Sequence, residues 1–171
     1  MKKDDELVKY LRHLNDEDLW MFYAHAGLEL KERKLVRTRN IVGGRGEFLA
    51  VKIYNETPGL ANLQAAPEGT RNVDALSRRG ERYTIKTVSK PGNITGVFYG
   101  CGEQDEPVPD RKFEFVVVVV IDKYYKPERV LELTWDQFLK HRRWNKTIRA
   151  WNLSLTKKLT AEAKIVFQRH D

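Results

Sequence analysis

FEFVVVVVI, residues 113–121, is the strongest strand signal in the chain. Its five consecutive valines favour β-structure, and a run that is apolar on both faces belongs in the middle of a sheet covered on both sides. Residues 122–128 predict a turn, and residues 130–133 a further strand. Residues 134–137 have the form of a capping box, which opens a helix through about residue 142. Together these segments predict a buried central strand with helices packed against its sheet.

Helical patterns dominate the first third of the chain. Apolar residues recur at three- and four-residue steps in residues 4–14 and again in residues 19–30, with Asn15 as a cap between the two runs. The aromatic stripe of the second run favours core or dimer packing. After the glycines of residues 43–46, Glu47 begins a third helical pattern that continues to residue 54.

The tail predicts a short strand near residues 150–155 and an amphipathic segment at residues 160–168. No internal repeat and no linker divides the chain. The order of these elements predicts one α/β domain, in which helices come first and a mixed β-sheet flanked by further helices follows.

The composition favours a polyanionic partner. The formal net charge is +7, from 31 Lys and Arg against 24 Asp and Glu, and cationic contacts with phosphates release counterions from nucleic acid. Cys101 is the only cysteine, which excludes an internal disulfide framework and suits a reducing cytoplasm. Residues 1–6 are charged without a following apolar segment, and the longest apolar run is far shorter than the ~20 residues that span a bilayer. We therefore expect a cytoplasmic protein that has no membrane segment.

Residues 72–87 predict a β-hairpin with a three-residue loop at residues 78–80. Such loops end with a residue in the left-handed region, and Gly80 stands at that place. The loop would pair Asp74 with Thr84, and side chains repeat on one face of a strand every two residues. Asp74, Thr84 and Lys86 are therefore predicted on one face of the hairpin, and residues 83 and 85 on the other.

A carboxylate beside an ammonium group suits phosphodiester hydrolysis. The carboxylate of Asp74 would hold Mg²⁺, and Lys86 would orient water or neutralise charge on the phosphoryl oxygens. The alternative is a cross-strand salt bridge, worth about 0–1 kcal/mol if it is exposed. Glu47 likewise has two interpretations: it is a second metal ligand, or it is a glutamate stabilised by the dipole at the start of its helix. The spacing of these residues leaves both alternatives open.

These motifs resemble the PD-(D/E)XK nuclease superfamily, which has the restriction-endonuclease-like fold. The resemblance covers residues 36–133 and includes RTRN (residues 37–40), the Gly46–Glu47 pair, GTRNVD (residues 69–74) and GERYTIK (residues 80–86). It is closest to small bacterial members in which an N-terminal helical segment precedes the core. Residues 1–35 would then be that segment, residues 36–133 the nuclease-like core, and residues 134–171 additional helix and strand elements of the same domain.

The resemblance implies a metal-dependent endonuclease that hydrolyses DNA, such as a restriction endonuclease. It assigns catalysis to Glu47, Asp74 and Lys86, and metal binding to Glu47, Asp74 and the carbonyl of Ile85, with Mg²⁺ as the cofactor and Mn²⁺ as a substitute. Thr84 departs from the pattern, because the superfamily usually has Asp or Glu there; some members recruit the helix glutamate instead. The alternative functions are a catalytically degenerate nucleic-acid-binding module of the same fold and a structural assembly partner.

Basic residues elsewhere are candidates for contacts with DNA phosphates. They are Arg37, Arg39, Arg78, Arg79, Arg142, Arg143 and Lys146. A solvated helix end with two core tryptophans explains the last three equally well. Superfamily habit further implies a homodimer whose two active sites cut both strands, with an interface that the N-terminal helices could supply. Nucleotide binding by the glycines of residues 43–46 is disfavoured, because no Gly-Lys-Ser/Thr follows them.

Overall fold

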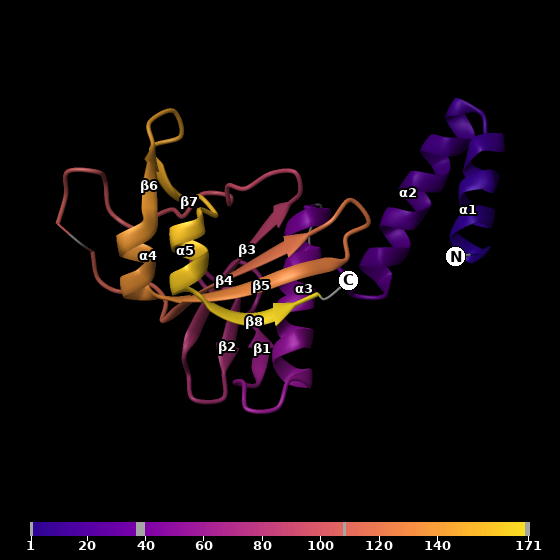
Figure 1. Cartoon of the computed structure of the whole chain (residues 1–171). Coiled ribbons are helices and arrows are strands. Elements are labelled where there is room, and N and C mark those ends of the chain that lie inside the picture. Colours follow the sequence, from indigo (N-terminus) through magenta and orange to yellow (C-terminus); the bar gives the residue numbers. More distant parts are fainter. Residues whose placement is uncertain (1, 37–39, 108, 170–171) are drawn as a thin grey trace. The chain divides into compact units, whose positions relative to one another are not determined.

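The computed structural model describes residues 2–36, 40–107 and 109–169. The chain forms two compact units, Met1–Arg39 and Asn40–Asp171 (Figure 1). Their boundary lies close to residue 35, where the helical segment was predicted to end. Arg37 and Arg39, both predicted to contact DNA, lie outside the described residues.

The first unit is a pair of helices, α1 (Lys2–His13) and α2 (Asp16–Glu32). Asn15 caps α2, since its side-chain oxygen accepts a hydrogen bond from the amide of Asp18 at 2.9 Å. Both predicted helices and the cap are confirmed. None of the residues of α2 is buried, so its aromatic stripe is not the core of this unit.

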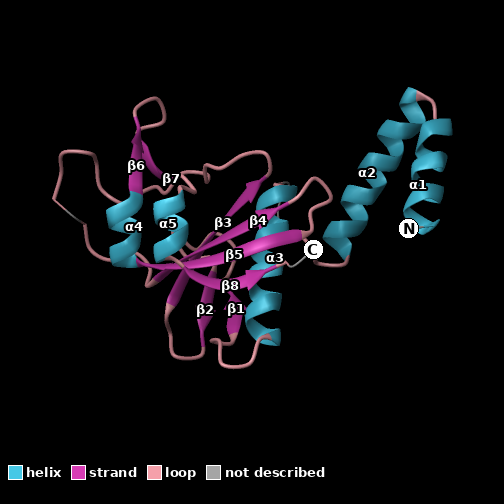
Figure 2. Ribbon diagram, in the orientation of Figure 1, coloured by secondary structure: helices cyan, strands magenta, loops and turns pink. Residues whose placement is uncertain are grey.

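The second unit is a mixed α/β structure, which confirms the predicted class (Figure 2). Its six-stranded sheet has the order β1-β2-β3-β4-β5-β8. All neighbours are antiparallel except β3 and β4, which run parallel. The strands are β1 (Leu63–Ala65), β2 (Ala75–Ser77), β3 (Arg82–Ser89), β4 (Phe115–Ile121), β5 (Pro127–Thr134) and β8 (Lys164–Gln168). A separate two-stranded sheet pairs β6 (Arg142–Asn145) with β7 (Ala150–Leu153), and the helices are α3 (Ile41–Glu56), α4 (Trp135–His141) and α5 (Lys157–Glu162).

β4 lies between β3 and β5, and its six residues from Val116 to Ile121 are at most 2% exposed. Alternate valines face two separate clusters: Val117 packs with α3, and Val118 packs with side chains of α4 and α5. The predicted central strand, covered on both faces, is therefore confirmed, and it begins at Phe115 rather than at residue 113.

α3 begins at Ile41 rather than at Glu47, so the glycines of residues 43–46 lie inside the helix. Asn40 caps this earlier start, because its side-chain oxygen accepts a hydrogen bond from the amide of Gly43 at 3.0 Å. Glycines usually mark loops, but Gly46 lies where the helix touches the sheet, and a Cβ there would overlap the hydroxyl of Thr87 on β3. The predicted helix start was wrong because the glycines serve a contact between distant segments.

The C-terminal elements follow the sequence pattern in most respects. The predicted capping box opens α4, with reciprocal hydrogen bonds between Thr134 and Gln137. Residues 160–168, predicted as one amphipathic segment, divide between the end of α5 and the edge strand β8. In the described parts of the chain, the helices are too short or too polar to cross a membrane.

Candidate active site

The hairpin that joins β2 to β3 has the predicted register. The amide of Ser77 donates to the carbonyl of Glu81 at 2.9 Å, and Ala75 pairs with Tyr83. Gly80 closes the loop with φ +82°, a conformation that side chains rarely adopt. Local turn chemistry therefore fixes which residues of the two strands face each other.

Asp74 lies just before β2, where the pairing with β3 ends. Its carboxylate oxygen Oδ2 accepts hydrogen bonds from the amide of Ile85 at 2.7 Å and from the hydroxyl of Thr84 at 3.1 Å. Its other oxygen, Oδ1, accepts no hydrogen bond from the described residues. The Asp74 carboxylate thus lies beside Thr84, as predicted, and keeps one oxygen available to a ligand.

Side chains of β3 alternate between the two faces of the sheet. Tyr83 and Ile85 pack with α3, while Lys86 points to the opposite side, where its ammonium lies 5.1 Å from the ring centroid of Phe98. A cation over an aromatic face is stabilised by the negative charge of the π-system. The predicted division of faces is therefore confirmed. Phe98 was not predicted, because it belongs to a long loop whose position depends on tertiary packing.

No ion pair within 4 Å joins Asp74 to Lys86, both of which are described. A main-chain amide and a hydroxyl hold the carboxylate, and an aromatic ring holds the ammonium. The simple cross-strand salt bridge is therefore not the arrangement of these two groups.

Glu47 is half-buried on α3, next to the residue at which this helix touches β3. Gly46 packs against Thr87, and Thr87 directly follows Lys86. Because the last β2–β3 pair is Ala75–Tyr83, this contact lies beyond the paired part of the hairpin. The fold thus brings the start of α3 to the middle of β3, just beyond the point at which β2 ends, while Lys86 lies on the opposite face of the sheet.

The candidate metal ligands are oxygen donors near the middle of β3. Mg²⁺ is usually bound by one or two carboxylates, with water and substrate phosphates completing its shell. Asp74, Glu47 and the Ile85 carbonyl supply oxygen atoms of that kind. Within the described ranges, three or more His, Cys, Asp or Glu side chains nowhere gather into a metal-binding group. An ion held here would therefore take most of its ligands from water and substrate.

An ion pair next to the hairpin ties β3 to the chain before β4. The guanidinium of Arg82 lies 2.7 Å from the carboxylate of Glu114, which also accepts the amide of Arg82. Hydrogen bonds from Arg82 lower the pKa of Glu114. The pair therefore stays charged at neutral pH and positions the first residue of β3.

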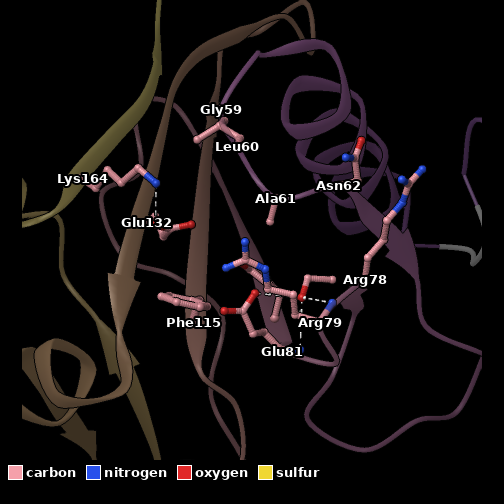
Figure 3. A pocket seen from close by; sticks show the side chains of 12 residues that line it. Gly59, Leu60, Ala61, Asn62, Arg78, Arg79, Glu81, Phe115, Glu132 and Lys164 are labelled. Carbon is pink, nitrogen blue, oxygen red and sulfur yellow. Dashed lines mark hydrogen bonds and ion pairs between the residues drawn. The ribbon is translucent and has the colours of Figure 1, made fainter.

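A polar cavity of about 350 Å³ lies at the turn end of the hairpin (Figure 3). The side chain of Arg79 points into it, and that of Arg78 extends away on the other side of the turn. Both arginines are exposed. Glu132 lines the far wall and is 8% exposed; its oxygens accept from Tyr54 at 2.6 Å and from Lys164 at 3.0 Å. The turn therefore presents two cations beside a buried carboxylate that is already neutralised.

The remaining predicted cations differ in their surroundings. Arg142 stacks 4.0 Å from the ring centroid of Trp151 and donates to the carbonyl of Cys101 at 2.7 Å. Burial lowers the pKa of Arg142. Arg143 and Lys146 are exposed. Arg142 therefore packs within the β6–β7 hairpin, whereas Arg143 and Lys146 are exposed to solvent.

The structure thus places the carboxylate of Asp74 against Ile85 in the middle of β3, where β2 ends. Lys86 follows on the face opposite the one that packs with α3. The predicted cations of the turn lie at the other end of the hairpin. The close approach of Gly46 had one sequence signal, a glycine next to a helical pattern. Compared with models of known protein families and with curated proteins, the sequence matches none of them.

Proposed function

We propose that the chain is a divalent-metal-dependent endonuclease that hydrolyses DNA phosphodiester bonds. The observation that carries the proposal is the position of Asp74. Its carboxylate is fixed by the amide of Ile85 at 2.7 Å, at the point where β2 leaves β3. Lys86 follows on the same strand. A carboxylate and a cation at an open strand end are what phosphoryl transfer requires.

We also propose that the second unit has the restriction-endonuclease-like fold. Its support is the order of elements: a helix with Glu47, a strand after Asp74, a strand with Lys86, and then a buried parallel neighbour. Fold and function are separate claims, because one fold can host many activities.

Glu47, Asp74 and the carbonyl of Ile85 would hold Mg²⁺, with Mn²⁺ as a substitute. When bound, the ion supplies polarisation of the phosphate and a lower pKa for a bound water. Lys86 would orient that water or neutralise charge on the phosphoryl oxygens. The aromatic ring of Phe98 restricts where the ammonium of Lys86 can move, so the cation is positioned before substrate binds.

DNA would be held by exposed cations of the β2–β3 turn and of the β6–β7 hairpin. Arg78, Arg79, Arg143 and Lys146 are exposed, and the chain carries a net charge of +7. Phosphate contacts of this kind weaken as the salt concentration rises, because the entropy gained by releasing counterions is then smaller.

A second candidate is a DNA-binding module that has lost catalysis. Thr84 favours it: this residue is 2% exposed and donates its hydroxyl to Asp74, where a nuclease of this superfamily usually has an acid. The site would then lack the acid that the superfamily usually places two residues before the lysine. DNA binding without cleavage is the expected behaviour.

The test is cleavage of plasmid and linear DNA with Mg²⁺ or Mn²⁺. Asp74→Asn, Glu47→Gln and Lys86→Met should each lower cleavage at least about 100-fold, as loss of one charge-stabilising group commonly does. Glu56→Gln and Lys52→Met, which alter an exposed pair on α3, are matched controls and should cleave normally. Metal-independent binding without cleavage would support the degenerate module. No affinity for DNA at low salt would refute both and favour an assembly role, and normal cleavage by Glu47→Gln would remove Glu47 from the site.

A further inference from the structure

The two helices of the first unit expose an unusual amount of apolar surface. Nine large apolar side chains there are 39–68% exposed. They are Leu7, Val8, Tyr10, Leu19, Trp20, Met21, Phe22, Tyr23 and Leu28. Isolated exposed side chains are normal, but a contiguous apolar surface of this size marks an interaction site.

α1 covers only one side of α2. Tyr10 of α1 contacts Phe22 of α2, with ring centroids 6.3 Å apart. A groove of about 650 Å³ between the helices is lined by Asp16 and by apolar residues, including Leu11 and Tyr23. Trp20 and Leu28 are the most exposed apolar residues of the unit, at 68% and 64%. A helix that is apolar on several sides is normally buried on several sides, and within its own unit α1 leaves much of the apolar surface of α2 uncovered.

Trp20, Ala24 and Leu28 are spaced four residues apart and therefore share one face of α2. Glu17 and Lys31 lie seven residues before and after Ala24, which places them at the two ends of that same stripe. The stripe thus has an apolar centre, one small residue at its midpoint, an acid at one end and a base at the other.

We propose that this stripe is a homodimer interface, in which α2 packs antiparallel on α2 of a second copy and the two helices cross near Ala24. A two-fold axis at Ala24 brings Glu17 of each copy opposite Lys31 of the other. A parallel arrangement would instead put Glu17 against Glu17 and Lys31 against Lys31, which is unfavourable. The charges therefore favour the antiparallel over the parallel direction.

The stripe is the centre of a larger exposed apolar surface. At about 200 Å² for a fully exposed large side chain, Trp20 and Leu28, 68% and 64% exposed, offer about 260 Å² per copy. Each partner of a standard interface covers about 800 Å², so other exposed side chains of the two helices must supply the remaining area. Two helical pairs joined in this way form a four-helix bundle, the usual way in which amphipathic helix pairs bury a shared core.

The first experiment measures the mass of the full chain by sedimentation equilibrium over a wide concentration range. We expect twice the 20.0 kDa of one chain. Trp20→Asp and Leu28→Asp should each give the monomer mass. Tyr124→Asp alters a side chain of the second unit that is equally exposed, at 67%, and should leave the dimer intact. A monomer at all concentrations would overturn the proposal, whether the stripe then packs on its own chain or on a different protein.

The second experiment tests the direction with charge reversals. Glu17→Lys and Lys31→Glu should each weaken dimerisation about ten-fold, because each places two like-charge pairs across the two-fold axis. The double variant Glu17→Lys/Lys31→Glu restores opposite charges and should recover most of the affinity. If the double variant dimerises as weakly as the single variants, the antiparallel pairing is wrong.

Cysteine cross-linking tests the crossing point directly. In a Cys101→Ser background, which leaves no other cysteine, Ala24→Cys should form a disulfide-linked dimer on oxidation. Glu17→Cys alone should not, while a mixture of Glu17→Cys and Lys31→Cys chains should. Cross-linking of Glu17→Cys with itself would instead show a parallel pair. None of these measurements depends on nuclease activity, so the dimer and the proposed function can fail separately.

Discussion

The contact between α3 and β3 predicts an unusual response to the substitution Gly46→Ala. Alanine normally stabilises a helix interior relative to glycine by about 1 kcal/mol. Here the added Cβ would overlap the Thr87 hydroxyl and lie 2.9 Å from the Thr87 Cβ, whereas carbon atoms pack comfortably at about 3.5–4.0 Å. Rotating the threonine removes the first conflict but not the second, so the helix must move away from the sheet.

Overpacking of this kind costs about 1–3 kcal/mol, and the overlap with two atoms of one residue places Gly46→Ala at the upper end. After the gain in helix propensity, we expect a net loss of about 2 kcal/mol. For a chain of this length that is a decrease in melting temperature of about 4–8 °C. The assay is thermal and urea unfolding of the second unit, followed by near-ultraviolet circular dichroism.

Two companion variants separate the clash from other effects. Thr87→Ala removes a hydroxyl that has no hydrogen-bond partner in the described chain, together with the methyl group. In the double variant it should recover about 1 kcal/mol of the loss, as contacting residues couple by that order. Gly27→Ala, where nothing lies within 4 Å of the added atom, should stabilise α2. If Gly46→Ala is as stable as the natural chain, the inferred close approach is wrong.

Two further predictions concern charged groups. Asp74→Ala should destabilise the second unit by about 1–3 kcal/mol, because the buried amide of Ile85 loses its acceptor; Asp74→Asn keeps an acceptor oxygen and should remain within about 1 kcal/mol of the natural chain in urea unfolding. Hydrogen bonds from Lys140 and then His141 hold the pKa of Glu162 at about 2. The stabilisation from Glu162 is therefore complete above the usual glutamate pKa and is lost as pH falls from there through about 2. The difference in urea midpoint between Glu162→Gln and the natural chain should vanish over that range, and a difference that persists at pH 2 would contradict this origin.

The parts of the fold that depend on local chemistry could be predicted from the sequence. Gly80 and the loop length determine the hairpin register, and the two-residue period then places Lys86 on the face opposite Ile85. The position of the central strand follows from the valine run, because a strand that is apolar on both faces is stable only where both faces are buried.

The parts that depend on long-range packing could not be predicted. α3 includes Gly46 because Thr87, forty-one residues later, approaches its backbone. Phe98 lies beside Lys86 only because a long irregular segment folds back over the sheet. The sequence likewise shows that α2 is apolar, but not that it remains uncovered within its own unit.

The hydrogen bond between the carboxylate of Asp74 and the amide of Ile85 has a consequence for ligand binding. A carboxylate on an ordinary surface side chain samples several rotamers, and ordering it costs about 0.5–1.5 kcal/mol when a ligand binds. In this protein the amide of Ile85 orients the Asp74 carboxylate when the chain folds, so the entropy loss does not recur when a ligand binds. Any cation or polar substrate that reaches the free oxygen of Asp74 therefore meets a preorganised acceptor, whose position changes only if the end of the sheet changes with it.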